Sequence, residues 1–289
     1  MISQSFFNFV WYKRAISELI IMSNKIKNIG SIQKLDGEGF IINNLSLRNL
    51  QQAYKPIIEE VISLYQSYFP EILHSVYLRG SVAKGTAVAQ IADVDSMALT
   101  TRKLTKEEQE KASEIWKIIE AKYDFITGLE VFVVGLEEVE NSKPLQFLLK
   151  TQCLCVFGED HTAILPKCKI GSKASYAHSF TLKEDLKKLH DWRQEGEDEK
   201  ELCSWIMKRI VRVGFELVMV REVCFTRDLY PCYELFTKHY PEKSIEMLDA
   251  LKLAVFPIDD PQKTDVVIEK TTPFLLEQIA QIDTKQLLS

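Results

Sequence analysis

The chain has 289 residues, of which 46% are hydrophobic and 27% are charged, enough apolar surface for one large or two ordinary folded domains. Its 36 basic and 41 acidic residues give a net charge of −5. Because no basic tail offsets this balance, a polymeric nucleic-acid substrate is disfavoured.

The first segment of the chain is apolar and aromatic, but charged residues interrupt it. Residues 1–22 include Lys13, Arg14 and Glu18, so the segment is too short and too polar for a membrane span. It also lacks a basic region before the apolar run and a small-residue cleavage site. Six scattered cysteines without paired spacing are expected to be reduced thiols. These features predict a cytoplasmic protein that makes no membrane contact.

Residues 1 to about 45 are expected to form a lead-in to the first folded domain. A helix is predicted over Leu47–Tyr68, where Pro56 should start or kink it. The run Ser75–Leu78 is short, β-branched and aromatic, which predicts a strand leading into Gly80.

The Gly80-Ser81 pair after this strand predicts a tight turn. Such a turn can place backbone N–H groups and a hydroxyl around a phosphate. A short helix is expected over Val82–Gln90, with its N-terminus facing the same space as Ser81. The turn is therefore a candidate phosphate site.

Two aspartates follow in a second predicted strand, Ala92–Thr100. Asp93 and Asp95 are two residues apart, and residues i and i+2 of a strand share a face. Paired carboxylates are the oxygen ligands that Mg²⁺ prefers, together with water and substrate phosphates. Phosphate and metal sites so close in sequence indicate nucleotide chemistry.

A third carboxylate comes from the next predicted strand. The segment Thr105–Tyr123 predicts an amphipathic helix that opens with a capping box formed by Thr105 and Glu108. The apolar strand Leu129–Val134 follows and contains one acid, Glu130. A charge in a buried strand is costly unless it is paired or metal-bound, so Glu130 is expected beside the two aspartates.

Gly80-Ser81, Asp93-x-Asp95 and Glu130 together resemble the active site of the DNA polymerase β-like nucleotidyltransferase superfamily. The resemblance implies that Asp93 and Asp95 hold two Mg²⁺ ions bridging a triphosphate, and that Ser81 contacts a terminal phosphate. It implies that Glu130 completes metal binding or takes the proton from the attacking hydroxyl.

The second half of the chain is predicted to be helical. Leu148–Asp160 predicts a helix end, a strand and a Gly-acid turn, an order similar to that of aminoglycoside adenylyltransferases. The predicted fold is α+β, with a mixed β-sheet nucleotidyltransferase domain over residues 1–165 and an all-helical domain over 166–289. Helical patterns in the second domain cover Leu182–Trp192, Leu202–Glu222, Asp228–His239, Glu242–Ala254 and Pro273–Leu288.

Four basic residues are candidates for nucleotide binding. The adenylyltransferase resemblance implies a basic residue after the long helix that reaches the triphosphate, and Arg227 falls at about that place. Lys208 and Arg212 on the helix either contact phosphate or form its solvated face. Lys84 occupies the basic place of the Gly-Ser-x-x-(Arg/Lys)-Gly pattern of antitoxin-like nucleotidyltransferases.

These patterns predict a metal-dependent enzyme that transfers a nucleoside monophosphate from an NTP, preferably ATP, to a hydroxyl of a small molecule. Pyrophosphate is released. The alternatives are a protein-modifying, antitoxin-like nucleotidyltransferase with a protein acceptor, and a nucleotide-binding interaction module without catalysis. Synthesis of an oligonucleotide second messenger is a further alternative, although it generally needs a longer chain.

Overall fold

The computed structural model describes residues 30–90 and 92–282, which divide into two compact units. The sheet unit comprises Asp36–Lys169, and the helical unit comprises residues 30–35 and 170–282. Residues 30–35 join the helical unit through a bridge between Gln33 and Phe225. Most of the predicted lead-in and the end of the predicted helix Pro273–Leu288 lie outside the described residues.

The sheet unit is built on four strands in the order β3-β2-β1-β4. β1 runs antiparallel to β2 and to β4, whereas β2 and β3 are parallel, so the predicted mixed sheet is confirmed. The bounds are β1 Leu73–Arg79, β2 Val94–Thr100, β3 Leu129–Gly135 and β4 Leu154–Gly158.

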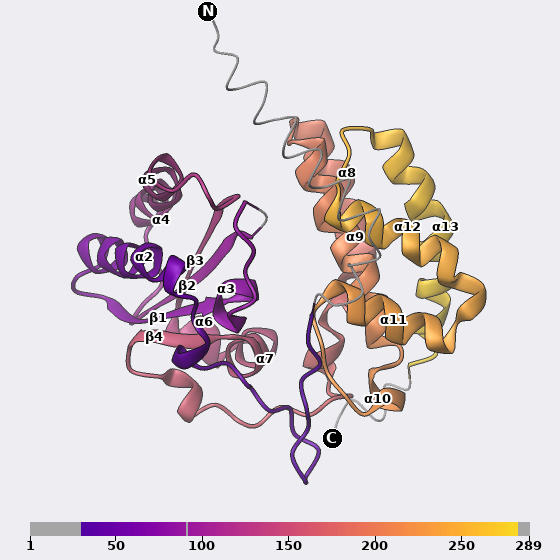
Figure 1. Cartoon of the computed structure of the whole chain (residues 1–289), viewed down its shortest axis with the longest axis horizontal. Helices are drawn as coiled ribbons and strands as arrows, with labels where there is room; N and C mark the ends of the chain where they lie inside the picture. Colours follow the sequence, from indigo (N-terminus) through magenta and orange to yellow (C-terminus); the bar gives the residue numbers. More distant parts are fainter. Residues whose placement is uncertain (1–29, 91, 283–289) are drawn as a thin grey trace, which may run out of the picture. The chain divides into compact units, whose positions relative to one another are not determined.

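Helices cover both faces of this sheet (Figure 1). Val76 and Leu78 of β1 belong to one apolar cluster with helices α2 and α5, while Tyr77 between them belongs to a second cluster with α6 and α7. This alternation follows from the two-residue period of a strand. The helices are α2 Lys55–Tyr68, α3 Gly80–Lys84, α4 Lys106–Ala112, α5 Glu114–Lys122, α6 Leu136–Glu140 and α7 Lys143–Gln152.

Three predicted helices have different bounds in the structure. The helix predicted from Leu47 begins at Lys55, because Pro56 occupies its first turn, where its missing N–H costs nothing. The helix predicted over Val82–Gln90 is the single turn α3, which Gly85 ends in a left-handed conformation. The helix predicted over Thr105–Tyr123 is split at Ser113 into α4 and α5, and its predicted capping box is confirmed.

The helical unit is organised around α9, which contacts α8, α10, α11, α12 and α13 (Figure 1). Its buried positions, from Leu202 to Phe215, recur at helical spacing on the faces toward these neighbours. The bounds are α8 Ala177–Glu195, α9 Glu199–Glu216, α10 Met219–Glu222, α11 Leu229–His239, α12 Ser244–Val255 and α13 Pro261–Ala280. Short 3-10 turns lie at Leu47–Asn49, Gln52–Tyr54, His161–Ala163, Lys173–Tyr176 and Pro241–Lys243.

Two predictions in this unit are corrected. The helix predicted over Leu202–Glu222 ends at Glu216, and a separate turn, α10, follows. Pro273 was expected in a first helical turn, but it lies inside α13, which begins at Pro261. Asp260 caps α13 by accepting a hydrogen bond from the N–H of Lys263. No helix among the described residues is long and apolar enough to cross a bilayer.

Candidate functional site

The Gly80-Ser81 turn lies where β1 runs directly into α3. Gly80 has φ +68°, a left-handed conformation that glycine adopts without strain. A Cβ atom at this position would lie 2.0 Å from Oδ2 of Asp95. The backbone of the turn therefore lies against the Asp95 carboxylate, and the Ser81 side chain beside it is half-buried.

Strand register brings three charged residues into one row across the sheet. Arg79 of β1 pairs with Asp95 of β2, and Asp95 pairs with Glu130 of β3. Residues paired across neighbouring strands have side chains on the same face. The predicted proximity of Asp95 and Glu130 is thus present in the fold.

Arg79 forms ion pairs with both acids. Its Nη2 atom lies 3.2 Å from Oδ1 of Asp95 and also contacts Oε2 of Glu130. The exposed fractions of the side chains are 26% for Arg79, 14% for Asp95 and 50% for Glu130. Burial opposes the charge of Arg79, but the two carboxylates outweigh it and raise the pKa of the guanidinium.

The environment of Glu130 differs from the one expected. The strand β3 lies at the edge of the sheet, and Glu130 is exposed, so the expectation of an acid within a buried strand is wrong. Its carboxylate is instead paired with Arg79 and open to solvent. An exposed carboxylate beside a second one is accessible to a substrate hydroxyl as well as to a metal ion.

Asp93 lies just before β2 and is exposed, between buried Ala92 and buried Val94. This alternation places Asp93 and Asp95 on the same side of the chain, as the spacing predicted. Within residues 30–90 and 92–282, no three carboxylate, imidazole or thiol groups gather into a preformed metal-ligand set. Arg79 instead contacts two of the three predicted ligands.

A buried hydrogen-bonded chain supports the site from the opposite face of the sheet. The hydroxyl of Tyr65 on α2 lies 2.9 Å from Oγ of Ser96, and Ser96 Oγ donates to the backbone carbonyl of Glu130 at 2.8 Å. Tyr65 and Ser96 are fully buried. This chain ties β3 to β2 at the level of the acids, and it was not predicted from the sequence.

Arg79 was also missed, although the sequence carried a signal. A charged residue follows the run Val76–Leu78 at the end of β1, directly before Gly80, and a charge there is expensive to bury without a partner. Lys84, the predicted basic residue of the turn, is the half-buried last residue of α3.

The basic residues predicted for nucleotide binding in the second half of the chain all lie in the helical unit. Lys208 and Arg212 are half-buried on α9, and Arg227 precedes α11. The Nε of Arg212 donates to the carbonyl oxygen of Arg227 at 3.2 Å. Their role in binding a nucleotide stays a prediction.

Arg227 is half-buried and contacts two buried polar residues, His178 and Glu216. Its Nη2 lies 2.6 Å from Nε2 of His178, and its Nη1 lies 3.7 Å from Oε1 of Glu216. Burial, and then the charge of Arg212, lowers the pKa of Arg227 to about 10. Glu216 also accepts hydrogen bonds from Ser179 N and Oγ at 2.7 and 2.6 Å. Arg227 therefore has a structural role as the counter-charge of Glu216.

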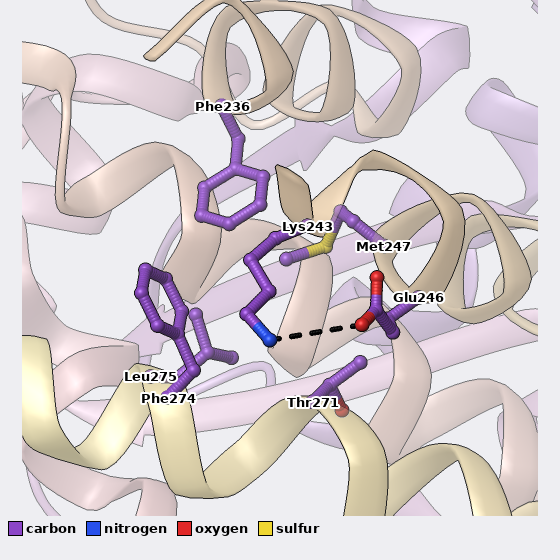
Figure 2. A pocket seen from close by; sticks show the side chains of 7 residues that line it. All are labelled: Phe236, Lys243, Glu246, Met247, Thr271, Phe274 and Leu275. Atoms are coloured by element: carbon purple, nitrogen blue, oxygen red, sulfur yellow. Dashed lines mark ion pairs between the residues drawn. The ribbon is translucent and has the colours of Figure 1, made fainter. Parts of the chain in front are cut away.

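A small pocket in the helical unit contains none of the predicted site residues. In Figure 2 the side chain of Lys243 lies between Phe274 and Glu246. Its Nζ forms an ion pair with Glu246 at 3.7 Å and lies 5.5 Å from the ring centre of Phe274. The lining is otherwise largely apolar: Phe236, Met247, Thr271 and Leu275. This mainly apolar lining is typical of a gap in the packing of helices α11, α12 and α13.

The fold is similar to that of a solved nucleotidyltransferase. The crystal structure of spectinomycin adenyltransferase AAD(9) from Enterococcus faecialis with ATP and spectinomycin matches with a TM-score of 0.55. The match has 14% sequence identity and covers 78% of this chain and 98% of that protein. The predicted α+β fold is thereby confirmed, and it is the fold of this adenyltransferase. No protein-family model and no curated protein sequence matches the chain.

Proposed function

We propose that the chain transfers a nucleoside monophosphate from an NTP, with ATP as the first candidate, to a hydroxyl of a small molecule, releasing pyrophosphate. The observation that carries this proposal is that the carboxylates of Asp95 and Glu130 contact the same atom, Nη2 of Arg79, beside the Gly80 turn. The fold shared with an adenyltransferase supports it.

The donor set fits a divalent metal ion. The Nη2 atom of Arg79 contacts one oxygen of Asp95 and one of Glu130, which shows that a single positive centre can reach both carboxylates. Asp93 would complete the set from the same side of the chain. Bound Mg²⁺ would polarise the phosphate oxygens and stabilise the negative charge that develops during transfer.

The chain's own residues have separate roles in this proposal. Glu130 is exposed at the sheet edge and takes the proton from the attacking hydroxyl. Gly80 has no side chain, so phosphate oxygens can approach the backbone of the turn, and the Ser81 hydroxyl donates a hydrogen bond to them. Lys84, on the same turn of helix, supplies positive charge for the phosphates.

The acceptor is proposed to be a small molecule. The excess of acidic over basic residues does not favour a nucleic acid. The structurally similar adenyltransferase was solved with ATP and spectinomycin, so these two compounds are the first to test.

The decisive experiment combines purified protein, labelled ATP and Mg²⁺ with spectinomycin and a panel of hydroxyl-bearing metabolites and antibiotics. We expect pyrophosphate release and a nucleotidylated product with the wild type. Asp95→Asn should lower turnover by at least about a hundredfold, because metal stabilisation supplies several kcal/mol.

The control is Asp249→Asn, which removes an exposed carboxylate of α12 in the helical unit and should leave turnover unchanged. A folded wild-type protein that binds neither ATP nor Mg²⁺–ATP in a calorimetric titration would contradict the proposal. Full turnover in a folded Asp93→Asn, Asp95→Asn double variant would contradict the metal assignment.

A further inference from the structure

The guanidinium of Arg79 lies against the candidate metal ligands, in the place where a metal cation would bind. It is the last residue of β1, and its guanidinium lies against Asp95 and Glu130 through one nitrogen, Nη2. Two carboxylates this close repel each other, and the guanidinium offsets that repulsion. The site therefore carries its own counter-charge.

The guanidinium is only partly satisfied in this position. Its Nε is buried and has no hydrogen-bond acceptor among the described residues. A buried donor without an acceptor costs free energy, so an arrangement that gives Nε an acceptor would lower the free energy of the Arg79 side chain. Arginine also binds phosphate oxygens readily through its planar N–H groups, so the phosphates of an incoming nucleotide offer the acceptors that Nε lacks.

We propose that Arg79 is an internal counter-ion that competes with divalent metal for Asp95 and Glu130, and that metal binds when the guanidinium leaves them. The inference rests on the proposed function, since it takes these acids as metal ligands. Its consequence is that metal alone binds weakly. The phosphates that arrive with the metal favour the release of Arg79 and strengthen binding, so metal and nucleotide bind cooperatively.

The test measures the binding of Mn²⁺ alone to the full chain, without nucleotide, by the electron paramagnetic resonance signal of free Mn²⁺. Arg79→Met keeps much of the length of the side chain and removes its charge, so we expect affinity for Mn²⁺ to rise about tenfold or more. Arg79→Gln, which also keeps a hydrogen-bond donor, provides a second neutral variant. Circular dichroism establishes that each variant is folded.

The matched control is Arg102→Met. Arg102 lies in the same unit and pairs with a different acid, Glu108, at 2.8 Å, so its loss should leave Mn²⁺ affinity unchanged. The same titration with ATP present should show a smaller gain of Mn²⁺ affinity from nucleotide in Arg79→Met than in the wild type.

The results separate the two proposals. Tighter Mn²⁺ binding in the neutral variants with no change in Arg102→Met supports the counter-ion role. Equal or weaker binding in these variants, with binding lost in Asp95→Asn, overturns that role and leaves the metal site intact. Wild type and Arg79 variants that bind Mn²⁺ no better than Asp95→Asn overturn both the role of Arg79 and the metal site.

Discussion

Gly80 and Asp95 are in such close contact that position 80 has no room for a side chain: a Cβ atom there would lie 2.0 Å from Oδ2 of the aspartate. The contact joins the candidate phosphate turn to the candidate metal ligand. Substitutions in the turn are therefore expected to act through the carboxylate as well as through the backbone.

Gly80→Ala should lower turnover by about a hundredfold, because the new methyl group displaces the Asp95 carboxylate and small misplacements of catalytic groups are costly. Pyrophosphate release in the presence of Mg²⁺ measures the effect. Gly37→Ala is the control, since nothing lies within 4 Å of a Cβ at that exposed position. Turnover within twofold of wild type in Gly80→Ala would show that the close contact has no functional importance.

Glu130→Gln keeps the shape of the side chain but removes the proton acceptor. Turnover should fall strongly while ATP affinity changes less, because a general base acts in the transition state. The side chain of Glu130 is half exposed, and exposed ion pairs contribute little to stability. The loss of its ion pair with Arg79 should therefore change the unfolding midpoint little. Glu107→Gln, an exposed acid of α4, is the control. A fully active Glu130→Gln enzyme would make this residue structural.

Gly85→Ala should destabilise the sheet unit through a backbone clash. Gly85 has φ +71°, and a Cβ would lie 2.0 Å from the carbonyl oxygen of Asn49. Gly39 has φ +83° in the same unit, with nothing within 4 Å of its Cβ, so Gly39→Ala carries only the conformational cost of about 1–2 kcal/mol. Urea unfolding should show a larger loss for Gly85→Ala than for Gly39→Ala. Equal losses would mean that the chain near Asn49 adjusts freely.

Stability should fall as the pH drops below about 6.5, the ordinary pKa of histidine, partly because of His178. Burial, and then the neighbouring Arg227, lowers the pKa of His178 well below that value. The unfolded chain then binds a proton that the folded chain does not, so protonation favours unfolding. The limiting slope is about 1.4 kcal/mol per pH unit.

The measurement is urea unfolding between pH 7.5 and 5.5. His178→Gln should lose less stability than wild type over this range, since glutamine does not titrate and can still accept a hydrogen bond from Arg227. His190→Gln changes an exposed histidine of the same helix and should behave as wild type. An identical pH dependence in wild type and His178→Gln would contradict the assignment.

Much of the fold could be predicted because its signals are local. The turn glycine, the Asp-x-Asp spacing and the capping box of Thr105 depend on residues a few positions apart, and the structure contains all three. The α+β class followed from the same patterns, since the period of apolar residues separates strands from helices.

Several features could not be predicted, because they depend on which segments become neighbours. The pattern of β3 shows an apolar strand, but its place at the edge of the sheet, which exposes Glu130, depends on pairing with β2 alone. The register between β1 and β2 decides that Arg79 faces Asp95. A strand's two-residue period determines which face a side chain occupies, whereas its partner on that face depends on the pairing of strands distant in sequence.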